Sequence, residues 1–75
     1  MSTPNKSDRA RGARIRAARN ARGLSVKQLA KLIDVHWKHM YALEQGKHRP
    51  GLETLRKLAD NLRVSMDHLD LGTKS

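Results

Sequence analysis

The feature that most constrains the fold is a helix-start pattern that recurs along the chain. Ser25 and Gln28 have the S-x-x-Q spacing of a capping box, in which each side chain accepts a hydrogen bond from the other residue's backbone N–H. Leu24 and Leu29 flank this box at the two positions of a hydrophobic staple. These signals predict that a helix begins at Val26.

The same pattern returns twice downstream. Residues 35–40 have His36 as the candidate N-cap, and residues 64–69 have Ser65. In both segments the first and last residues are apolar and occupy the staple positions, so each segment predicts the start of a short helix. Because no segment alternates apolar and polar residues as a half-buried strand would, we expect only helices.

Two longer helices are predicted from composition and periodicity. An Ala- and Arg-rich stretch of high helix propensity follows the candidate N-cap Ser7 and runs to Arg22, with Gly23 as its stop. After a turn at residues 49–51, leucines recur at helical spacing over residues 52–62. The remaining helix stops are expected at Gly46 and Gly72.

These elements are expected to form one small domain. The prediction is an all-α, five-helix domain over residues 8–71, with a flexible basic arm over residues 1–7 and a flexible tail over residues 72–75. Cysteine is absent, and the longest apolar run, residues 40–43, is far too short to cross a membrane. Because the N-terminus also lacks the apolar region of a secretion signal, we expect a cytoplasmic protein with no cofactor.

Positive charge is concentrated in the first two thirds of the chain. The net charge is +9, and residues 1–49 carry twelve basic and three acidic side chains, whereas residues 50–75 carry four of each. Because Lys and Arg side chains that neutralise phosphates release condensed counterions, this asymmetry favours a polyanion as the partner. A solvated basic surface without a partner is the alternative.

The second and third predicted helices are separated by the short turn 34–36, which is a helix-turn-helix arrangement. Around it, the chain resembles the Cro and phage-repressor (XRE-type) helix-turn-helix family over about residues 12–71, in the strings GARIRAARNARGLSVKQLAKLIDV and ALEQGKHRPGLETLRKLADNLRVSMDHL. The order and spacing of Arg-x-x-Arg-x-x-x-Gly-Leu-Ser, Leu-Ala, Leu-Glu-x-Gly-Lys and Pro-x-Leu-x-Thr-Leu carry the resemblance. It implies a repressor-like fold that binds double-stranded DNA.

The resemblance also implies roles for single residues. Arg19 and Glu44 match a structural ion pair that ties the first helix to the third. The family's base-reading positions fall at Trp37, Lys38 and Ala42, with Tyr41 beside them. Its contacts with the DNA backbone fall at Gln45, Lys47, His48 and Arg49, for which an ordinary solvated loop is the alternative. Further backbone contacts are expected from Lys27, Gln28, His36 and His39.

Three positions depart from the family pattern. Val26 replaces a glutamine that often binds phosphate, so one familiar DNA contact is missing. Asp34 replaces the usual turn glycine, a change that aspartate tolerates because it adopts left-handed backbone more readily than most residues. Ala18 replaces a leucine of the first helix, which predicts a thinner core.

Helical geometry selects the same outer face of the third helix without the family. At about 100° per residue, Met40 and Leu43 define the buried side, and the outward positions are Lys38, Tyr41, Ala42 and Gln45. A lysine can donate to guanine O6 and N7, whereas an alanine can contact only a thymine methyl group. The pattern therefore predicts a half-site that contains guanine.

Trp37 and the histidines beside it each have two interpretations. The indole of Trp37 can pack at the mouth of the DNA groove, or it can fold back onto the core. His36 and His39 have the i, i+3 spacing of a metal-binding pair. Without cysteine or a nearby carboxylate, helix capping or phosphate contact is favoured, and no metal is expected.

The basic side chains before Gly23 exceed what the first helix needs for folding. We expect phosphate or minor-groove contacts from the arm residues Lys6, Arg9 and Arg11. A solvated basic face is the competing interpretation.

The leading hypothesis is a sequence-specific transcriptional regulator, most simply a repressor, that binds a palindromic operator as a homodimer. One unit contacts too few base pairs for genomic specificity, so two half-sites about 34 Å apart are expected. The candidate dimer contacts, which can equally just close the core, are Val64, Met66, Leu69 and Leu71. The family also implies a bacterial, phage or plasmid origin and association with the nucleoid.

Three other functions remain open at this length. An antitoxin that represses its own operon and binds a toxin has the same domain, and so does a non-specific architectural DNA-binding protein. An RNA or protein adaptor is a third, although Trp37 and Tyr41 are too few aromatics for a single-strand stacking platform. An enzyme is disfavoured, because the chain has no Gly-rich phosphate loop, no nucleophile with its base, and only dispersed carboxylates.

Overall fold

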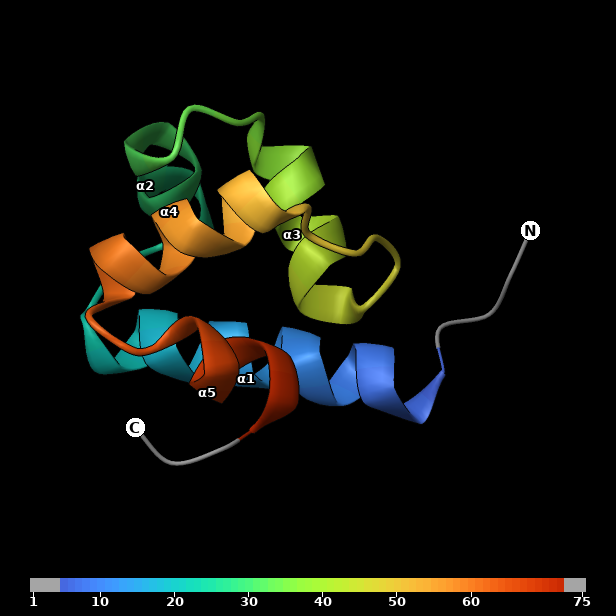
Figure 1. Cartoon of the computed structure of the whole chain (residues 1–75). Helices are drawn as coiled ribbons and strands as arrows, with labels where there is room; N and C mark the ends of the chain where they lie inside the picture. Colours follow the sequence, from blue (N-terminus) through green and yellow to red (C-terminus); the bar gives the residue numbers. More distant parts are fainter. Residues whose placement is uncertain (1–4, 73–75) are drawn as a thin grey trace.

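The computed structural model describes residues 5–72, and these residues form five α-helices and no strand (Figure 1). The helices are α1 (Lys6–Ala21), α2 (Val26–Leu32), α3 (Trp37–Gln45), α4 (Leu52–Leu62) and α5 (Met66–Leu71). The expected all-α, five-helix architecture is confirmed. Within the same residues no helix combines the length and the apolar character needed to span a membrane.

Local capping sets three of the helix starts where the sequence predicts them. At α2 the capping box is complete: Ser25 Oγ accepts from Gln28 N at 3.0 Å, and Gln28 Oε1 accepts from Ser25 N at 2.8 Å. At α3, His36 Nδ1 accepts from the backbone N–H of Lys38 at 3.1 Å. At α5, Ser65 Oγ accepts from the backbone N–H of the third helical residue at 2.9 Å.

The start of α1 differs from the prediction. The N-cap is Asn5, whose Oδ1 accepts from Asp8 N at 2.8 Å, so the helix begins at Lys6 and the expected cap Ser7 lies inside it. Asparagine caps helices as well as serine does, and the sequence signals for the two positions are equivalent. The rest of the proposed arm, residues 1–4, and residues 73–75 of the proposed tail lie outside the described residues.

Most helix ends use left-handed backbone. The expected stops Gly23, Gly46 and Gly72 have φ angles of +68°, +80° and +78°. Asp34 (φ +59°) does the same in the turn after α2, where its departure from glycine is tolerated. Arg63 (φ +58°) at the end of α4 was not predicted, and a side chain in this conformation costs about 1 kcal/mol.

The core collects apolar side chains from all five helices. Its fully buried members are Ile15, Leu29, Ile33, Met40, Leu43, Leu58 and Leu69. Ala18, the position where the sequence predicts a thinner core, is only partly buried at the edge of this cluster. The small core is therefore shared by all five helices.

The first helix crosses closely over the end of α3 (Figure 1). A Cβ atom on Gly12 would lie 2.7 Å from the carbonyl carbon of Glu44, and one on Gly46 would lie 2.9 Å from the carbonyl carbon of Asp8. Real Cβ atoms do not approach backbone this closely, so both positions require glycine. Direct contact of two backbones thus fixes α3 against α1.

Candidate nucleic-acid interface

The third helix presents one side to the core and the other to solvent. Met40 and Leu43 are buried, as the periodicity predicts. On the outer side Lys38, Tyr41 and Gln45 are exposed, and Ala42 is half-buried between them. The structure therefore brings the predicted base-reading residues together on one accessible surface.

An ion pair holds the C-terminal half of α3. Arg19 Nε lies 2.7 Å from Glu44 Oε2 and its Nη2 lies 3.0 Å from Oε1, so the contact is bidentate. The remaining terminal nitrogen of Arg19 donates to the Leu24 carbonyl oxygen at 2.8 Å. The side chains of Arg19 and Glu44 are only 11% and 3% exposed, which makes this contact a structural clamp between α1 and α3.

The indole of Trp37 lies on the surface at the first turn of α3 and is 40% exposed. The His36 ring stacks beside it at 5.9 Å between centroids. Two ammonium groups lie over the indole, Lys27 Nζ at 5.3 Å and Lys38 Nζ at 5.8 Å from the ring centroid. Of the two interpretations, the structure thus agrees with a surface position rather than a place in the core.

A shallow pocket of about 360 Å³ opens between α2 and the start of α3. Its charged and aromatic lining residues are Lys27, Lys31, Asp34, His36 and Trp37. The two lysines outnumber the single aspartate, and this net positive charge suits a phosphate or sugar at the edge of a DNA groove.

The histidines have separate places. His36 caps α3 through Nδ1, which makes it an acceptor toward the helix. His39 on α3 and His48 in the following loop are both exposed, and their ring centroids lie 5.5 Å apart. Within residues 5–72 no group of three or more potential ligands is gathered that could hold a metal ion.

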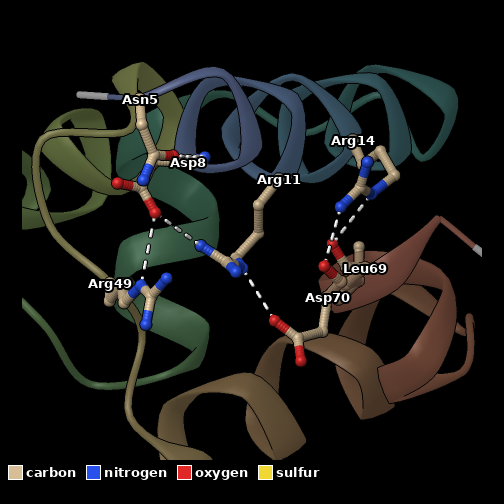
Figure 2. A network of polar contacts seen from close by, with 7 residues as sticks. All are labelled: Asn5, Asp8, Arg11, Arg14, Arg49, Leu69 and Asp70. Carbon is tan, nitrogen blue, oxygen red and sulfur yellow. Dashed lines mark hydrogen bonds and ion pairs between the residues drawn. The ribbon is translucent and has the colours of Figure 1, made fainter.

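The loop after α3 carries Lys47, His48 and Arg49, all exposed. Arg49 is 70% exposed, and its Nε donates to Asp8 Oδ1 at 3.2 Å. The same carboxylate oxygen accepts from Arg11 Nη1 at 3.1 Å, and Arg11 Nε donates to Asp70 Oδ1 at 2.7 Å. Figure 2 shows this chain of contacts, here called the Asp8 network: Arg49, Asp8, Arg11 and Asp70.

The Asp8 network shifts the pKa values of two of its members. Desolvation raises the pKa of Asp8, but hydrogen bonds from Arg49 and Arg11 outweigh it and bring that pKa below its usual value. Desolvation lowers the pKa of Arg11, but its contacts with Asp70 and Asp8 outweigh this effect and bring the pKa above its usual value. Both groups therefore stay ionised, and the network is a fixed array of alternating charges.

The arm residues do not share one environment. Lys6 and Arg9 are exposed on the first turns of α1. Arg11 is different, because its side chain is only 11% exposed and its guanidinium contacts two carboxylates. This long-range engagement leaves Arg11 poorly placed for the DNA contact that the sequence suggests.

Sequence reasoning gave no role to Arg14 or Asp70, which help to join α1 to α5. Arg14 Nε donates to the Leu69 carbonyl oxygen at 2.9 Å and its Nη2 to the Asp70 carbonyl oxygen at 2.8 Å, so it caps the end of α5 (Figure 2). The i, i+3 spacing of Asp8 and Arg11 could have signalled a local ion pair. No local pattern could have placed Asp70 beside them, 59 residues away from Arg11.

Comparisons with known proteins find a matching family model and similar solved structures. A family model described as helix-turn-helix matches residues 15–69. The restriction-modification controller protein C.AhdI from Aeromonas hydrophila is 29% identical with a TM-score of 0.82, over 87% of this chain and 98% of its own. The P22 c2 repressor, solved with synthetic operator 9T, is 30% identical with a TM-score of 0.81, over 84% of this chain and 96% of its own.

The clp gene regulator ClgR from C. glutamicum is also similar in structure, at 25% identity and a TM-score of 0.78, over 87% of this chain and 84% of its own. A search of curated protein sequences finds no match.

Proposed function

Because the chain belongs to the Cro and phage-repressor type of helix-turn-helix family and is a DNA-binding transcriptional regulator, we propose that it is a repressor that binds a palindromic operator as a homodimer. The observation that carries this proposal is the outer face of α3. That face is exposed, while Met40 and Leu43 on the opposite side hold the helix in the core.

Base reading is proposed for four residues of this face. Lys38 donates to guanine O6 and N7 in the major groove, and the half-buried Ala42 contacts a thymine methyl group. Tyr41 and Trp37 flank them and supply apolar contact with bases or sugars.

Backbone contacts are proposed on both sides of that face. The exposed side chains to which we assign contacts with phosphate oxygens are Lys27, Gln28, His36, His39, Gln45, Lys47, His48 and Arg49. Three of these are already engaged in part, because His36 Nδ1 and Gln28 Oε1 accept capping hydrogen bonds and Arg49 Nε donates to Asp8 Oδ1. Each keeps another nitrogen for DNA. Lys6 and Arg9 extend the basic surface along α1.

Dimerisation is proposed through α5. Leu71 is 67% exposed there, and Val64 and Met66 are half-buried, whereas Leu69 is fully buried and closes the core.

The P22 c2 repressor on its synthetic operator supports DNA binding by a chain of this size and fold. Two copies related by a two-fold axis would place their α3 helices about 34 Å apart, one turn of DNA.

Selection of bound sites from a random duplex pool tests the proposal. We expect an inverted repeat with a guanine in each half-site and a centre-to-centre spacing of about one helical turn. A pool that shows no enriched sequence would instead indicate a non-specific architectural protein, for which only the electrostatic component of binding remains.

A further inference from the structure

One acidic residue lies directly beside the loop that faces DNA in the proposed function. Asp8 belongs to the first turn of α1, yet its Oδ1 accepts from Arg49 Nε in the loop after α3 at 3.2 Å (Figure 2). An acidic side chain next to a phosphate contact would ordinarily weaken DNA binding by repulsion. The position of Asp8 beside this loop therefore needs a physical reason.

The position of Asp8 relative to the loop is rigid. The loop begins at Gly46, and a Cβ atom there would lie 2.9 Å from both the carbonyl carbon and the carbonyl oxygen of Asp8, so the two backbones are in contact. The same oxygen, Asp8 Oδ1, also accepts from Arg11 Nη1 at 3.1 Å, and Arg11 is itself bound to Asp70. Asp8 is only 19% exposed, and the pKa of its carboxyl group is lowered, so it presents a fixed negative charge to the loop.

The guanidinium of Arg49 is only partly used by this contact. Its Nε is bound to Asp8, while among residues 5–72 its two terminal nitrogens have no protein partner and the side chain is 70% exposed. An arginine can satisfy a carboxylate through one edge and a phosphate through its terminal nitrogens at the same time. A free arginine would lose side-chain rotamer freedom on binding phosphate, and one already held at Nε loses less.

We propose that Asp8 is a positioning residue for DNA binding, which holds Arg49 through Nε so that its two terminal nitrogens meet a backbone phosphate. This inference rests on the proposed function, because it takes the loop at residues 47–49 to face DNA. It makes the first turn of α1 part of the DNA-binding machinery without any direct contact between Asp8 and DNA.

The Asp8→Asn variant separates this idea from simple electrostatics, because the two predict opposite signs. Removing a negative charge raises the net charge from +9 by one, and bulk electrostatics then predicts tighter binding. Loss of positioning predicts binding weaker by about 3-fold to 10-fold, the cost of immobilising one long side chain. The matched control is Asp60→Asn on the exposed surface of α4, which makes the same charge change away from the loop.

The experiment measures the Kd of the full chain for a selected duplex and a random duplex over a range of salt concentrations, with circular dichroism to verify folding. We expect Arg49→Ala to weaken all duplexes and to lower the salt slope by about one. Asp8→Asn should also weaken binding, it should have little further effect in the Arg49→Ala background, and Asp60→Asn should bind as the unchanged chain does or slightly tighter.

A second variant keeps the Asp8–Arg11–Asp70 contacts intact. Arg49→Lys preserves the charge but cannot use one edge for Asp8 and the other for phosphate, so its affinity should fall about 3-fold. Binding of Asp8→Asn at or above the Asp60→Asn level, or of Arg49→Lys at the level of the unchanged chain, would overturn the positioning role. An Arg49→Ala variant with unchanged affinity would overturn it as well. Lys38→Ala, measured on the same duplexes, tests base reading alone. Its result therefore tests the proposed function independently of the Asp8 proposal.

Discussion

The arginines of α1 and the lysines of α2 and α3 carry the same charge but differ in what they contact. Arg11, Arg14 and Arg19 donate to carboxylates and to backbone carbonyl groups of distant segments. Lys27 and Lys38 are exposed and lie over the ring of Trp37. The net charge therefore overstates how many basic side chains are available to DNA, because these three arginines hold the helices together.

The basic residues therefore fall into two groups, one that should control stability and one that should control affinity for DNA. Changes at the α1 contacts are expected to lower the free energy of unfolding, whereas changes on α2 and α3 are expected to lower affinity for DNA with little effect on folding. The predictions below test that division, from the largest expected effect to the smallest.

The largest effect is expected at the buried ion pair. Glu44→Ala leaves the Arg19 guanidinium, only 11% exposed, without its carboxylate, which should cost about 3 to 5 kcal/mol of unfolding free energy. Urea denaturation followed by circular dichroism measures the loss. The neighbouring exposed Gln45→Ala variant should stay within about 0.5 kcal/mol of the unchanged chain. Equal stability of the two variants would show that the ion pair does not clamp α3.

A comparable effect is expected where α1 crosses α3. Gly12→Ala places a Cβ atom 2.7 Å from the Glu44 carbonyl carbon, and the helices must separate at a cost of about 3 kcal/mol. Gly51→Ala is the control, because nothing lies within 4 Å of the added atom, and it should cost less than about 1 kcal/mol. A Gly12→Ala midpoint in urea equal to that of the control would contradict the close crossing.

On the other side of the comparison, Lys38→Ala should change specificity rather than stability. Discrimination at one base pair of the selected site should fall by about 1 to 3 kcal/mol, with affinity for random duplexes nearly unchanged. Competition binding with single-base variants of the site measures this effect. Lys57→Ala on α4, also exposed, serves as the control. Uniform weakening on all sequences would assign Lys38 to phosphate contact.

A smaller effect is expected at Trp37. Trp37→Leu removes the ring beneath Lys27 and Lys38, and each cation–π contact at an exposed site contributes about 0.5 to 1 kcal/mol. We expect weaker binding to the selected duplex and a partial recovery in Trp37→Phe. A double-mutant cycle with Lys38→Ala measures the coupling. Additive effects in that cycle would mean that the ring does not orient the lysine.

The smallest effect is a change in acid stability. The pKa of Asp8 is lowered in the folded chain from its ordinary value of 3.8, so its contribution to stability is present above that value and is lost as pH falls through the lowered pKa. The Asp8→Asn variant lacks this group, so its unfolding free energy should depend less on pH below about pH 4. Parallel pH profiles for the two proteins would contradict the ion pairing of Asp8.

Local signals in the sequence were enough to predict much of the fold. The capping box at Ser25 and the caps at His36 and Ser65 depend only on residues within three positions, and the structure has all of them. The start of α1 was wrong by two residues because Asn5 and Ser7 are equally good caps.

The site was harder to predict where its contacts are long-range. Arg11 belongs to the basic segment that the sequence suggests as a DNA-binding arm. Its guanidinium nevertheless donates to Asp70 in α5, 59 residues away. The left-handed Arg63 at the end of α4 was likewise not predictable, because arginine has no local preference for that backbone. Periodicity identified the outer face of α3, but the Lys27 ammonium over Trp37 comes from α2 and could not be predicted from α3 alone.

The central claim is that the outer face of α3 and the loop after it meet DNA, while Arg11, Arg14 and Arg19 of α1 serve the fold. Amide chemical-shift changes of the ¹⁵N-labelled chain, titrated with a selected duplex and then with a scrambled one, test it most directly. The account predicts large changes with both duplexes at residues 47–49, and changes that depend on the sequence of the duplex at Trp37, Lys38 and Tyr41. Changes confined to α4 and α5, with α3 unaffected, would contradict it.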